Sequence, residues 1–174
     1  MRKVKIIECP RDAMQGIKTH FISTENKVRY INSLLKVGFD TIDFGSFVSP
    51  KAIPQMRDTA DVLSQLDLSE TKSKLQAIVA NVRGANDASK FDEIHYLGYP
   101  FSISENFQMR NTGKTIAQSL KILNDILSIA KRSNKKVVAY LSMGFGKPYG
   151  DPWNVDIVAK WTDILAKMGV EILS

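Results

Sequence analysis

The sequence predicts a single α/β domain in which parallel strands alternate with helices. Short apolar runs rich in β-branched residues alternate along the chain with longer segments whose apolar residues recur at helical spacing. Glycine or proline stands at several of the boundaries, where one element would end before the next begins. This order is typical of βαβ units, which bury their strands beneath outer helices. The length of 174 residues, 44% of them hydrophobic, suits one soluble domain with one core.

The first half of the chain is predicted to hold three strands and two helices. Ser23 and Thr24 are good helix caps, and the apolar residues after them fall on one helical face until Gly38 ends the segment. Two prolines mark the loop before the second helical segment. The predicted strands are 3–9, 39–45 and 75–81, and the predicted helices are 25–38 and 55–66.

The second half is predicted to hold three more strands and two long helices. We expect only a short helical turn between the third and fourth strands, and a polar loop over SENFQMRNTGK (104–114). Thr115 or a neighbour caps the longest helix, a loop rich in Gly and Pro covers 144–152, and Gly169 ends the last helix. The predicted strands are 93–99, 135–143 and 170–174, and the predicted helices are 115–133 and 153–169.

Two architectures fit this order of elements: an open doubly wound sheet and a (β/α)8 TIM barrel. In both, ligands bind beyond the C-terminal ends of the strands. The turn after the first strand reads ECPRDAMQG and lacks the GxGxxG and GxxxxGK[ST] patterns of nucleotide sites, which disfavours the doubly wound sheet. A TIM barrel has eight strands in about 250 residues. With about six strands, the predicted fold is an incomplete TIM barrel, with residues 1–174 as its N-terminal part.

Polar side chains follow the ends of the predicted strands. Arg11 and Asp12 come just past the first strand, so we expect them to project into the mouth of the barrel rather than into the core. Adjacent residues of a strand point to opposite faces, which makes an ion pair between these two awkward and favours a ligand as their partner. For any single Ser or Asn, a role as helix cap or loop residue is an equal alternative. The candidate site residues are Arg11, Asp12, Gln15, Asp43, Ser46, Asn81, Arg83, Ser102, Glu105, Ser142 and Ser174.

The chain is basic, with a formal net charge of +6 at pH 7 and a pI near 9.4. Apart from KRSNKK (131–136), which reads as the solvated end of a helix, the basic residues are dispersed, and no aromatic residues interleave with them. The sequence therefore disfavours a nucleic-acid partner.

The sequence also disfavours a disulfide, a zinc site, a membrane span and a secretory signal. Cys9 is the single cysteine, so it cannot form an intrachain disulfide, and we expect it to be a buried structural residue. His20 and His95 are far apart and form no zinc motif. No apolar run reaches the length of a membrane span, and the start MRKVK leads into no cleavage site, so we expect a cytoplasmic protein without a membrane partner.

Five motifs carry a resemblance to a known family. They are PRDAMQ (10–15), DFGSFVSPKAIPQM (43–56), ANVRG (80–84), SENFQMRNT (104–112) and PYGDP (148–152). Along essentially the whole chain, the sequence resembles the 3-hydroxy-3-methylglutaryl-CoA (HMG-CoA) lyases of the DRE-type TIM-barrel metallolyases. The Arg-Asp pair is shared by the wider superfamily, whereas SFVSPK and PQM are more specific to the lyases.

The resemblance implies a reaction and roles for four residues. It implies a metal-dependent cleavage of HMG-CoA into acetoacetate and acetyl-CoA, with an acyl-CoA as the substrate partner. Asp12 matches a ligand of a divalent cation, Mg²⁺ or Mn²⁺. Arg11 matches the arginine that faces the thioester and would stabilise the enolate oxygen. Ser46 and Ser174 match serines that bind the carboxylate region of the substrate.

The chain departs from the family at several positions near this site. Asp43 stands where many of the lyases carry glutamate, so a shorter side chain must reach the network around Arg11. Ala13 and Met14 replace the usual glycine and leucine, and GFGKPYG (144–150) lacks the cysteines of the usual loop. These departures affect the expected substrate more than the expected fold.

The resemblance also implies that parts of the family's site lie beyond Ser174. These parts are the remaining metal ligands, an aspartate and an HxH pair, and the loop with the catalytic cysteine. Asp12 alone would bind a magnesium-like ion weakly. We therefore expect a fragment that is inactive by itself and that forms a homo-oligomer, because its edge strands are open.

Two alternatives remain open at this point. One is a condensing relative of the isopropylmalate or homocitrate synthase type, which SFVSPK disfavours. The other is a non-catalytic half-barrel that keeps its binding surfaces without chemistry.

Overall fold

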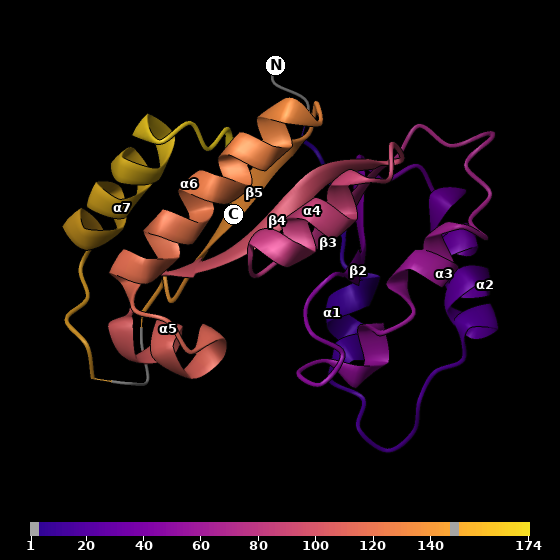
Figure 1. The fold of residues 1–174 in the computed structure, drawn as a ribbon, viewed down its shortest axis with the longest axis horizontal. Helices are drawn as coiled ribbons and strands as arrows, with labels where there is room; N and C mark the ends of the chain where they lie inside the picture. Colours follow the sequence, from indigo (N-terminus) through magenta and orange to yellow (C-terminus); the bar gives the residue numbers. More distant parts are fainter. Residues whose placement is uncertain (1–3, 147–149) are drawn as a thin grey trace.

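The structure, a computed structural model, describes residues 4–146 and 150–174, and its six strands form one curled parallel sheet (Figure 1). The strands lie in the order β1-β2-β3-β4-β5-β6, and each pairs in parallel with the next along the chain. A doubly wound sheet reverses its order at a switch point, and the described strands never do. The prediction of an incomplete TIM barrel is therefore confirmed. The strands are Ile7–Glu8 (β1), Thr41–Ser46 (β2), Lys74–Ile78 (β3), Ile94–Ser102 (β4), Lys136–Ser142 (β5) and Ile172–Leu173 (β6).

Helices fill the connections between successive strands. Figure 1 shows α4 in front of β3 and β4, with α6 and α7 farther along the same face. The helices are Pro10–Gln15 (α1) and Thr24–Leu35 (α2) after β1, Pro54–Met56 (η1, a 3₁₀ turn) and Thr59–Leu63 (α3) after β2, Val82–Ser89 (α4) after β3, Glu105–Thr112 (α5) and Ile116–Arg132 (α6) after β4, and Val155–Lys167 (α7) after β5.

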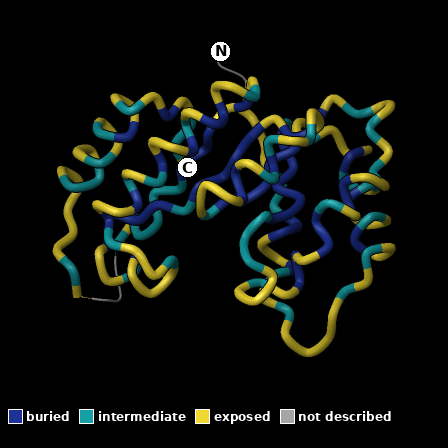
Figure 2. The backbone as a smooth tube through the Cα atoms, in the orientation of Figure 1, coloured by how far each residue is buried: buried dark blue, intermediate teal, exposed yellow. Residues whose placement is uncertain are grey.

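The core lies between the strands and the inner faces of these helices (Figure 2). Leu123 and Ile126 of α6 are fully buried, as are Ile42 of β2 and Leu97 of β4. Burying an aliphatic side chain of this size contributes about 1.5–3 kcal/mol. The packed helices thus hold the sheet so that the carboxyl ends of its strands gather at one edge.

The amphipathic helices were predicted well. Ser23 caps α2 and Asn154 caps α7, each through a side-chain oxygen that accepts from the backbone near the helix start. Thr115 forms a capping box with Gln118 at the start of α6, as the sequence predicted for this residue.

Two predicted loops are helical. PRDAMQ (10–15) forms α1 instead of a turn, because Pro10 occupies the first helical position, where its missing N–H costs nothing. Most of the predicted polar loop 104–114 forms α5, capped by Ser104. Only Gln108 of α5 is buried, so the segment carries no apolar stripe by which its sequence could predict a helix.

Three further boundaries differ from the prediction. Strand β1 covers only two residues of the predicted 3–9, of which Lys3 lies outside the described residues. The predicted helix 55–66 is split into η1 and α3, with the buried Asp58 between them. The segment between β3 and β4 holds a helix of eight residues, α4, rather than a short turn.

Within the two described ranges of the chain, no helix is both long and apolar enough to cross a membrane.

Candidate active site at the carboxyl ends of the strands

Arg11 is held in the first turn of α1 by a buried ion pair with Asp43. Asp43 lies on β2 and is fully buried, and Arg11 is 8% exposed. The Arg11 Nε lies 3.1 Å from Oδ2 and 3.3 Å from Oδ1 of Asp43, and Nη2 lies 2.5 Å from Oδ2. This is a forked, charge-assisted contact, which fixes the guanidinium plane. The prediction that Arg11 projects out of the core is therefore wrong for most of its side chain.

Arg11 also pairs with Asp12, contrary to the prediction from strand geometry. Nη1 of Arg11 lies 3.0 Å from Oδ1 of Asp12, and Gln15 donates to the same oxygen at 2.8 Å. The expectation was wrong because it assumed that the two residues lie on a strand, whereas they lie in the first turn of α1, where the alternation of strand faces does not apply. Gln15 reaches Asp12 because residues three apart on a helix share a face. The side chain of Asp12 is 65% exposed and lines the cavity described below.

The charge of Arg11 is stable in this setting. Burial lowers the pKa of the guanidinium, but the hydrogen bonds and the negative charge of Asp43 outweigh burial, and the net direction is upward. Arg11 is therefore permanently charged, and its guanidinium is held in one orientation.

Tyr140 and Gln76 extend the network beneath Arg11. The Tyr140 hydroxyl lies 3.5 Å from Oδ2 of Asp43 and accepts a hydrogen bond from Nε2 of Gln76 at 2.5 Å. Burial, followed by the charge of Asp43, raises the pKa of Tyr140, so the phenol stays protonated. In the described part of the chain, Oε1 of Gln76 is buried without a hydrogen-bond partner. Asp43, although one methylene shorter than the glutamate of many lyases, thus reaches Arg11. Tyr140 connects Asp43 to Gln76.

A cavity of about 360 Å³ opens at this point. Four predicted site residues line it, together with five that the prediction did not place at the site. The predicted residues are Arg11, Asp12, Gln15 and Ser142, and the others are Cys9, Ile78, Pro100, Asn111 and Tyr140.

Little in the sequence indicates that the five other residues line a cavity. Cys9 was expected to be buried, but it is only partly buried at the end of β1. Asn111 lies in the segment that was predicted as a loop, and Tyr140 lies inside a predicted strand. The alternation of side chains along a strand predicts which residues share a face, but not which face meets the cavity.

Three of the other candidates lie beside the site or are engaged elsewhere. Ser46 lines a neighbouring cavity, where its Oγ accepts from the backbone of Val48. The Asn81 side chain caps α4 through the N–H of Gly84, and Glu105 accepts from the N–H of Ile116. For Asn81 and Glu105 these contacts match the structural alternative of a helix cap.

The remaining candidates, at the ends of β3, β4 and β6, do not line the Arg11 cavity. Ser174 is exposed, and its backbone continues the β5·β6 ladder, with the Leu141 N–H donating to its carbonyl at 2.7 Å. Ser102 donates to the Ser142 carbonyl at 3.0 Å, and Arg83 lies with Ser46 on the neighbouring cavity.

The donor set at this edge does not make a complete metal site. No group of three or more His, Cys, Asp or Glu side chains that could hold an ion occurs within residues 4–146 and 150–174. Magnesium and manganese take about six oxygen ligands. Asp43 is committed to Arg11, so Asp12 is the single carboxylate that lines the cavity. It could supply one ligand.

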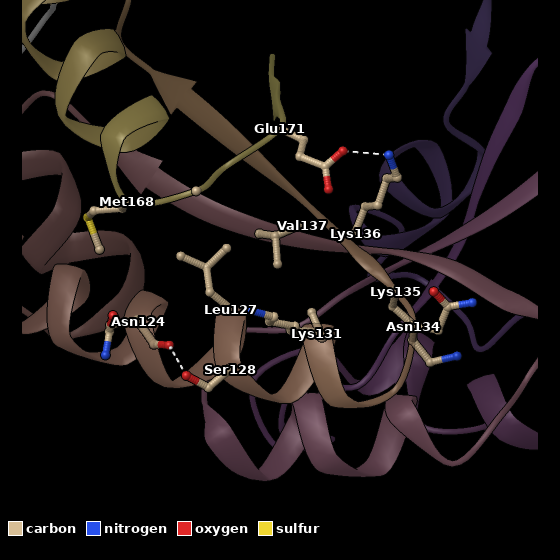
Figure 3. Close-up of a pocket in the computed structure, with 12 residues that line it drawn as sticks. Asn124, Leu127, Ser128, Lys131, Asn134, Lys135, Lys136, Val137, Met168 and Glu171 are labelled. Carbon is tan, nitrogen blue, oxygen red and sulfur yellow. Dashed lines mark hydrogen bonds and ion pairs between the residues drawn. The ribbon is translucent and has the colours of Figure 1, made fainter.

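A larger cavity, of about 540 Å³, lies at the amino ends of strands β5 and β6 (Figure 3). It is bounded by the end of α6, the start of β5 and the turn before β6, and Lys136 pairs with Glu171 there at 2.5 Å. Ligand sites of parallel α/β barrels lie at the carboxyl ends of the strands, so the Arg11 cavity is the better candidate despite its smaller volume.

Comparison with known proteins finds no family model that matches the chain, but it finds clear relatives. A Bacillus subtilis hydroxymethylglutaryl-CoA lyase is 35% identical over 174 residues, which cover 99% of this chain and 57% of the relative. The human mitochondrial hydroxymethylglutaryl-CoA lyase is 32% identical over 171 residues, covering 97% of this chain and 51% of the relative. A rat relative, 32% identical over 149 residues that cover 84% of this chain and 42% of the relative, is named as a cytoplasmic 3-hydroxy-3-methylglutaryl-CoA lyase.

Solved structures of HMG-CoA lyases match the fold. The B. subtilis HMG-CoA lyase superposes with a TM-score of 0.91 at 34% identity, covering 99% of this chain and 57% of that one. An Acinetobacter baumannii HMG-CoA lyase, solved in complex with coenzyme A and 3-methylmalate, superposes with a TM-score of 0.88 at 27% identity, covering 97% and 54%.

The chain spans about half the length of these relatives. Over nearly its own whole length, in sequence and in fold, it is a homologue of the hydroxymethylglutaryl-CoA lyases.

Proposed function

We propose that this chain supplies the Arg11 side of the active site of a carbon–carbon lyase that cleaves HMG-CoA into acetyl-CoA and acetoacetate. The observation that carries the proposal is the forked Arg11–Asp43 pair, buried at the carboxyl ends of the strands and facing a cavity. Homology to the hydroxymethylglutaryl-CoA lyases supports the substrate. We also propose the cytoplasm as its location.

Arg11 has a specific task in this reaction. When the tertiary hydroxyl loses its proton and becomes the ketone of acetoacetate, the carbon–carbon bond breaks and its electron pair moves toward the thioester. Negative charge then develops on the thioester oxygen, as in an enolate. A cation that is already aimed at that position stabilises the transition state without reorganising. Asp43 holds Arg11 in this orientation, and the neutral Tyr140 supports Asp43.

For the metal, we propose that Asp12 supplies one oxygen ligand to Mg²⁺ or Mn²⁺. Its exposed carboxylate lies beside Arg11 at the cavity, and carboxylate oxygens suit both ions. The residues within the described ranges do not offer a group of three or more such side chains, so water, substrate oxygens or residues outside these ranges would supply the ion's other ligands. For the same reason we propose that the 174-residue chain is inactive by itself.

Among the remaining candidates, we propose Gln15 and Ser142 as substrate contacts, because both line the Arg11 cavity. Ser46 and Ser174 stay proposals for the carboxylate region, with Ser46 reached from the neighbouring cavity. Asn81 and Glu105 act as helix caps and belong to the frame of the site.

The test is an assay of acetyl-CoA release from HMG-CoA with Mg²⁺ or Mn²⁺. It compares the product of the full open reading frame, its Arg11→Gln variant and, where that frame runs past Ser174, the 174-residue chain. We expect release by the complete protein, a loss of about 10²–10³-fold in kcat for Arg11→Gln, and none from the 174-residue chain. Equal rates for the complete protein and its variant would refute the role of Arg11. No release by the complete protein would favour a non-catalytic half-barrel or a condensing relative.

A further inference from the structure

Gln76 and Tyr140 meet across an intervening strand beneath the Arg11 cavity. Gln76 lies on β3 and Tyr140 on β5, and β4 runs between them. At this level β4 carries Gly98, where a Cβ would lie 3.3 Å from Nε2 of Gln76 and 3.3 Å from Cε2 of Tyr140. The same Cβ would lie 2.5 Å from Cδ1 of Ile78. The two polar side chains therefore touch because the strand between them has no side chain at this position.

The contact fixes the direction of the Tyr140 hydroxyl proton. Nε2 of Gln76 donates to the Tyr140 oxygen at 2.5 Å. A phenol carries one proton, and an amide nitrogen that donates cannot accept it, so the proton points away from Gln76. It can then go to Oδ2 of Asp43, at 3.5 Å, or to an oxygen of a ligand in the Arg11 cavity, which Tyr140 lines.

Asp43 is the poorer of these two acceptors. Its Oδ2 already accepts from Nη2 of Arg11 at 2.5 Å and from Nε of Arg11 at 3.1 Å. The 3.5 Å to the Tyr140 oxygen is well beyond the range of about 2.5–3.0 Å that is usual for an O–H···O bond. The Tyr140 proton is therefore available to a ligand oxygen that comes closer.

Gln76 keeps this orientation although it leaves an acceptor unpaired. The side chain is 1% exposed, and among residues 4–146 and 150–174 its Oε1 is the buried side-chain atom without a hydrogen-bond partner. An unpaired buried acceptor is unfavourable, and an apolar side chain of similar size would avoid it. Polar groups that break the pairing rule are typical of functional sites, so the amide favours a role in the site over packing alone.

Tyr140 and Arg11 offer two donors to the same place. Both reach Oδ2 of Asp43, and both line one cavity, so their donor groups lie close together. Arg11 is charged, whereas Tyr140 is a neutral donor. A cation and a neutral donor that are oriented in advance stabilise an oxygen on which negative charge develops.

We propose that Gln76 is a positioning residue, which turns the Tyr140 hydroxyl so that it donates, beside Arg11, to the oxygen that becomes the enolate. The role of Tyr140 in catalysis rests on the proposed function, whereas the direction of its proton does not.

The first experiment measures that direction without the reaction. Burial, followed by the charge of Asp43, raises the pKa of Tyr140, so difluorotyrosine, a more acidic phenol, replaces it and is titrated by its absorbance. The protein is the product of the full open reading frame. The variants are Gln76→Leu and the matched control Gln65→Leu, at an exposed glutamine after α3. Circular dichroism checks that each is folded.

We expect Gln76→Leu to raise the titration midpoint of the phenol, because the phenolate loses a hydrogen-bond donor. The control should leave the midpoint where it is. A lower midpoint in Gln76→Leu would show that Gln76 accepts the proton and turns it away from the cavity. A lower or an unchanged midpoint would therefore overturn the proposal.

The second experiment asks whether Gln76 acts through Tyr140. It measures kcat and KM for HMG-CoA in Gln76→Leu, in Tyr140→Phe and in the double variant. Gln76→Leu should lower kcat by about tenfold and change KM by less than about twofold, because it disturbs a contact made in the transition state. In the Tyr140→Phe background the same substitution should cost no further activity. Equal losses in both backgrounds would show an effect on packing alone and overturn the proposal.

The failure of this inference can be told from the failure of the proposed function. If the midpoint rises as expected but the protein releases no acetyl-CoA, the direction of the proton stands, and the lyase proposal falls together with the catalytic role of Tyr140. If the protein is a lyase and Gln76→Leu keeps the wild-type kcat, the lyase stands and the positioning role of Gln76 falls.

Discussion

Asp43 keeps Arg11 charged and in one orientation, because a fully buried carboxylate pairs there with a nearly buried guanidinium. Asp43→Asn would remove the buried counter-charge and leave the guanidinium only the exposed carboxylate of Asp12, which costs up to about 3–5 kcal/mol in the free energy of unfolding. Urea denaturation measures this loss. Asp87→Asn, which breaks an exposed pair with Lys90, is the matched control and should barely move the midpoint. Equal midpoints for the two variants would contradict the account.

The reactivity of Cys9 can be used to measure the effect of the charges around Arg11, because Cys9 lines the same cavity. It is the single cysteine, so alkylation of the chain's thiol reads out this position alone. Burial, followed by the charge of Asp43, raises the pKa of the thiol, and Arg11 only partly opposes them. The reactive thiolate should therefore form at higher pH than in a small cysteine peptide. Alkylation by iodoacetamide, followed against pH, should reach half its maximal rate above the pH found for the peptide. A midpoint below that of the peptide would show that Arg11 dominates.

At the scale of elements, α4 packs closely against the loop that follows β2. A Cβ on Gly84 would lie 2.7 Å from the carbonyl oxygen of Phe47, which is backbone and cannot turn away. Gly84→Ala should therefore destabilise the protein by about 1–3 kcal/mol, although alanine is the better helix former.

Gly16→Ala is the matched control for this substitution. The backbone of Gly16 has a φ of −78°, and a Cβ added there would meet nothing within 4 Å. Alanine at this position should leave stability unchanged or raise it by about 0.4–1 kcal/mol. Thermal melts of both variants test the contact, and a Gly84→Ala protein that melts at or above the wild-type temperature would show that α4 is free to move.

The sequence predicted the elements that bury a long apolar stripe. Helices α2, α6 and α7 and the order of the six strands were found because burial imposes a period on such residues. Helices α1 and α5 were missed because they are short and mostly polar. The turn η1 and helix α3 were merged because the spacing of apolar residues does not reveal a break of two residues.

The candidate site was predicted less completely than the fold. Arg11, Asp12 and Ser142 were expected at the mouth because strand ends gather there, and they line one cavity. The direction of Arg11 could not be predicted, because it depends on Asp43 across a strand pairing and on a helix that the sequence did not reveal. Tyr140 needed the register of β5, which no local pattern contains.

At the scale of the whole molecule, the sheet has two open edges. Strands β1 and β6 each have one neighbour among the described strands, and Val4, Ile6 and Ile7 near the first edge are 84%, 62% and 44% exposed. An uncovered edge with apolar side chains invites pairing with a second copy. We expect the 174-residue chain to self-associate, with a sedimentation coefficient that rises with concentration.

A charge at that edge should weaken the association. Ile6→Lys places a cation beside β1, whereas the control Val37→Lys places one at an exposed position after α2. Sedimentation velocity should show a smaller oligomer for the first variant and no change for the second. A wild-type chain that stays monomeric at all concentrations would contradict this prediction.

The central claim is that Arg11 faces the thioester of an acyl-CoA. The most direct measurement is a crystal structure of the 174-residue chain with HMG-CoA, which we expect this chain to leave uncleaved. The account predicts the thioester oxygen within hydrogen-bond distance of the Arg11 guanidinium, with the Arg11–Asp43 pair intact. A thioester bound away from Arg11, with the guanidinium contacting only Asp12 and Asp43, would contradict it.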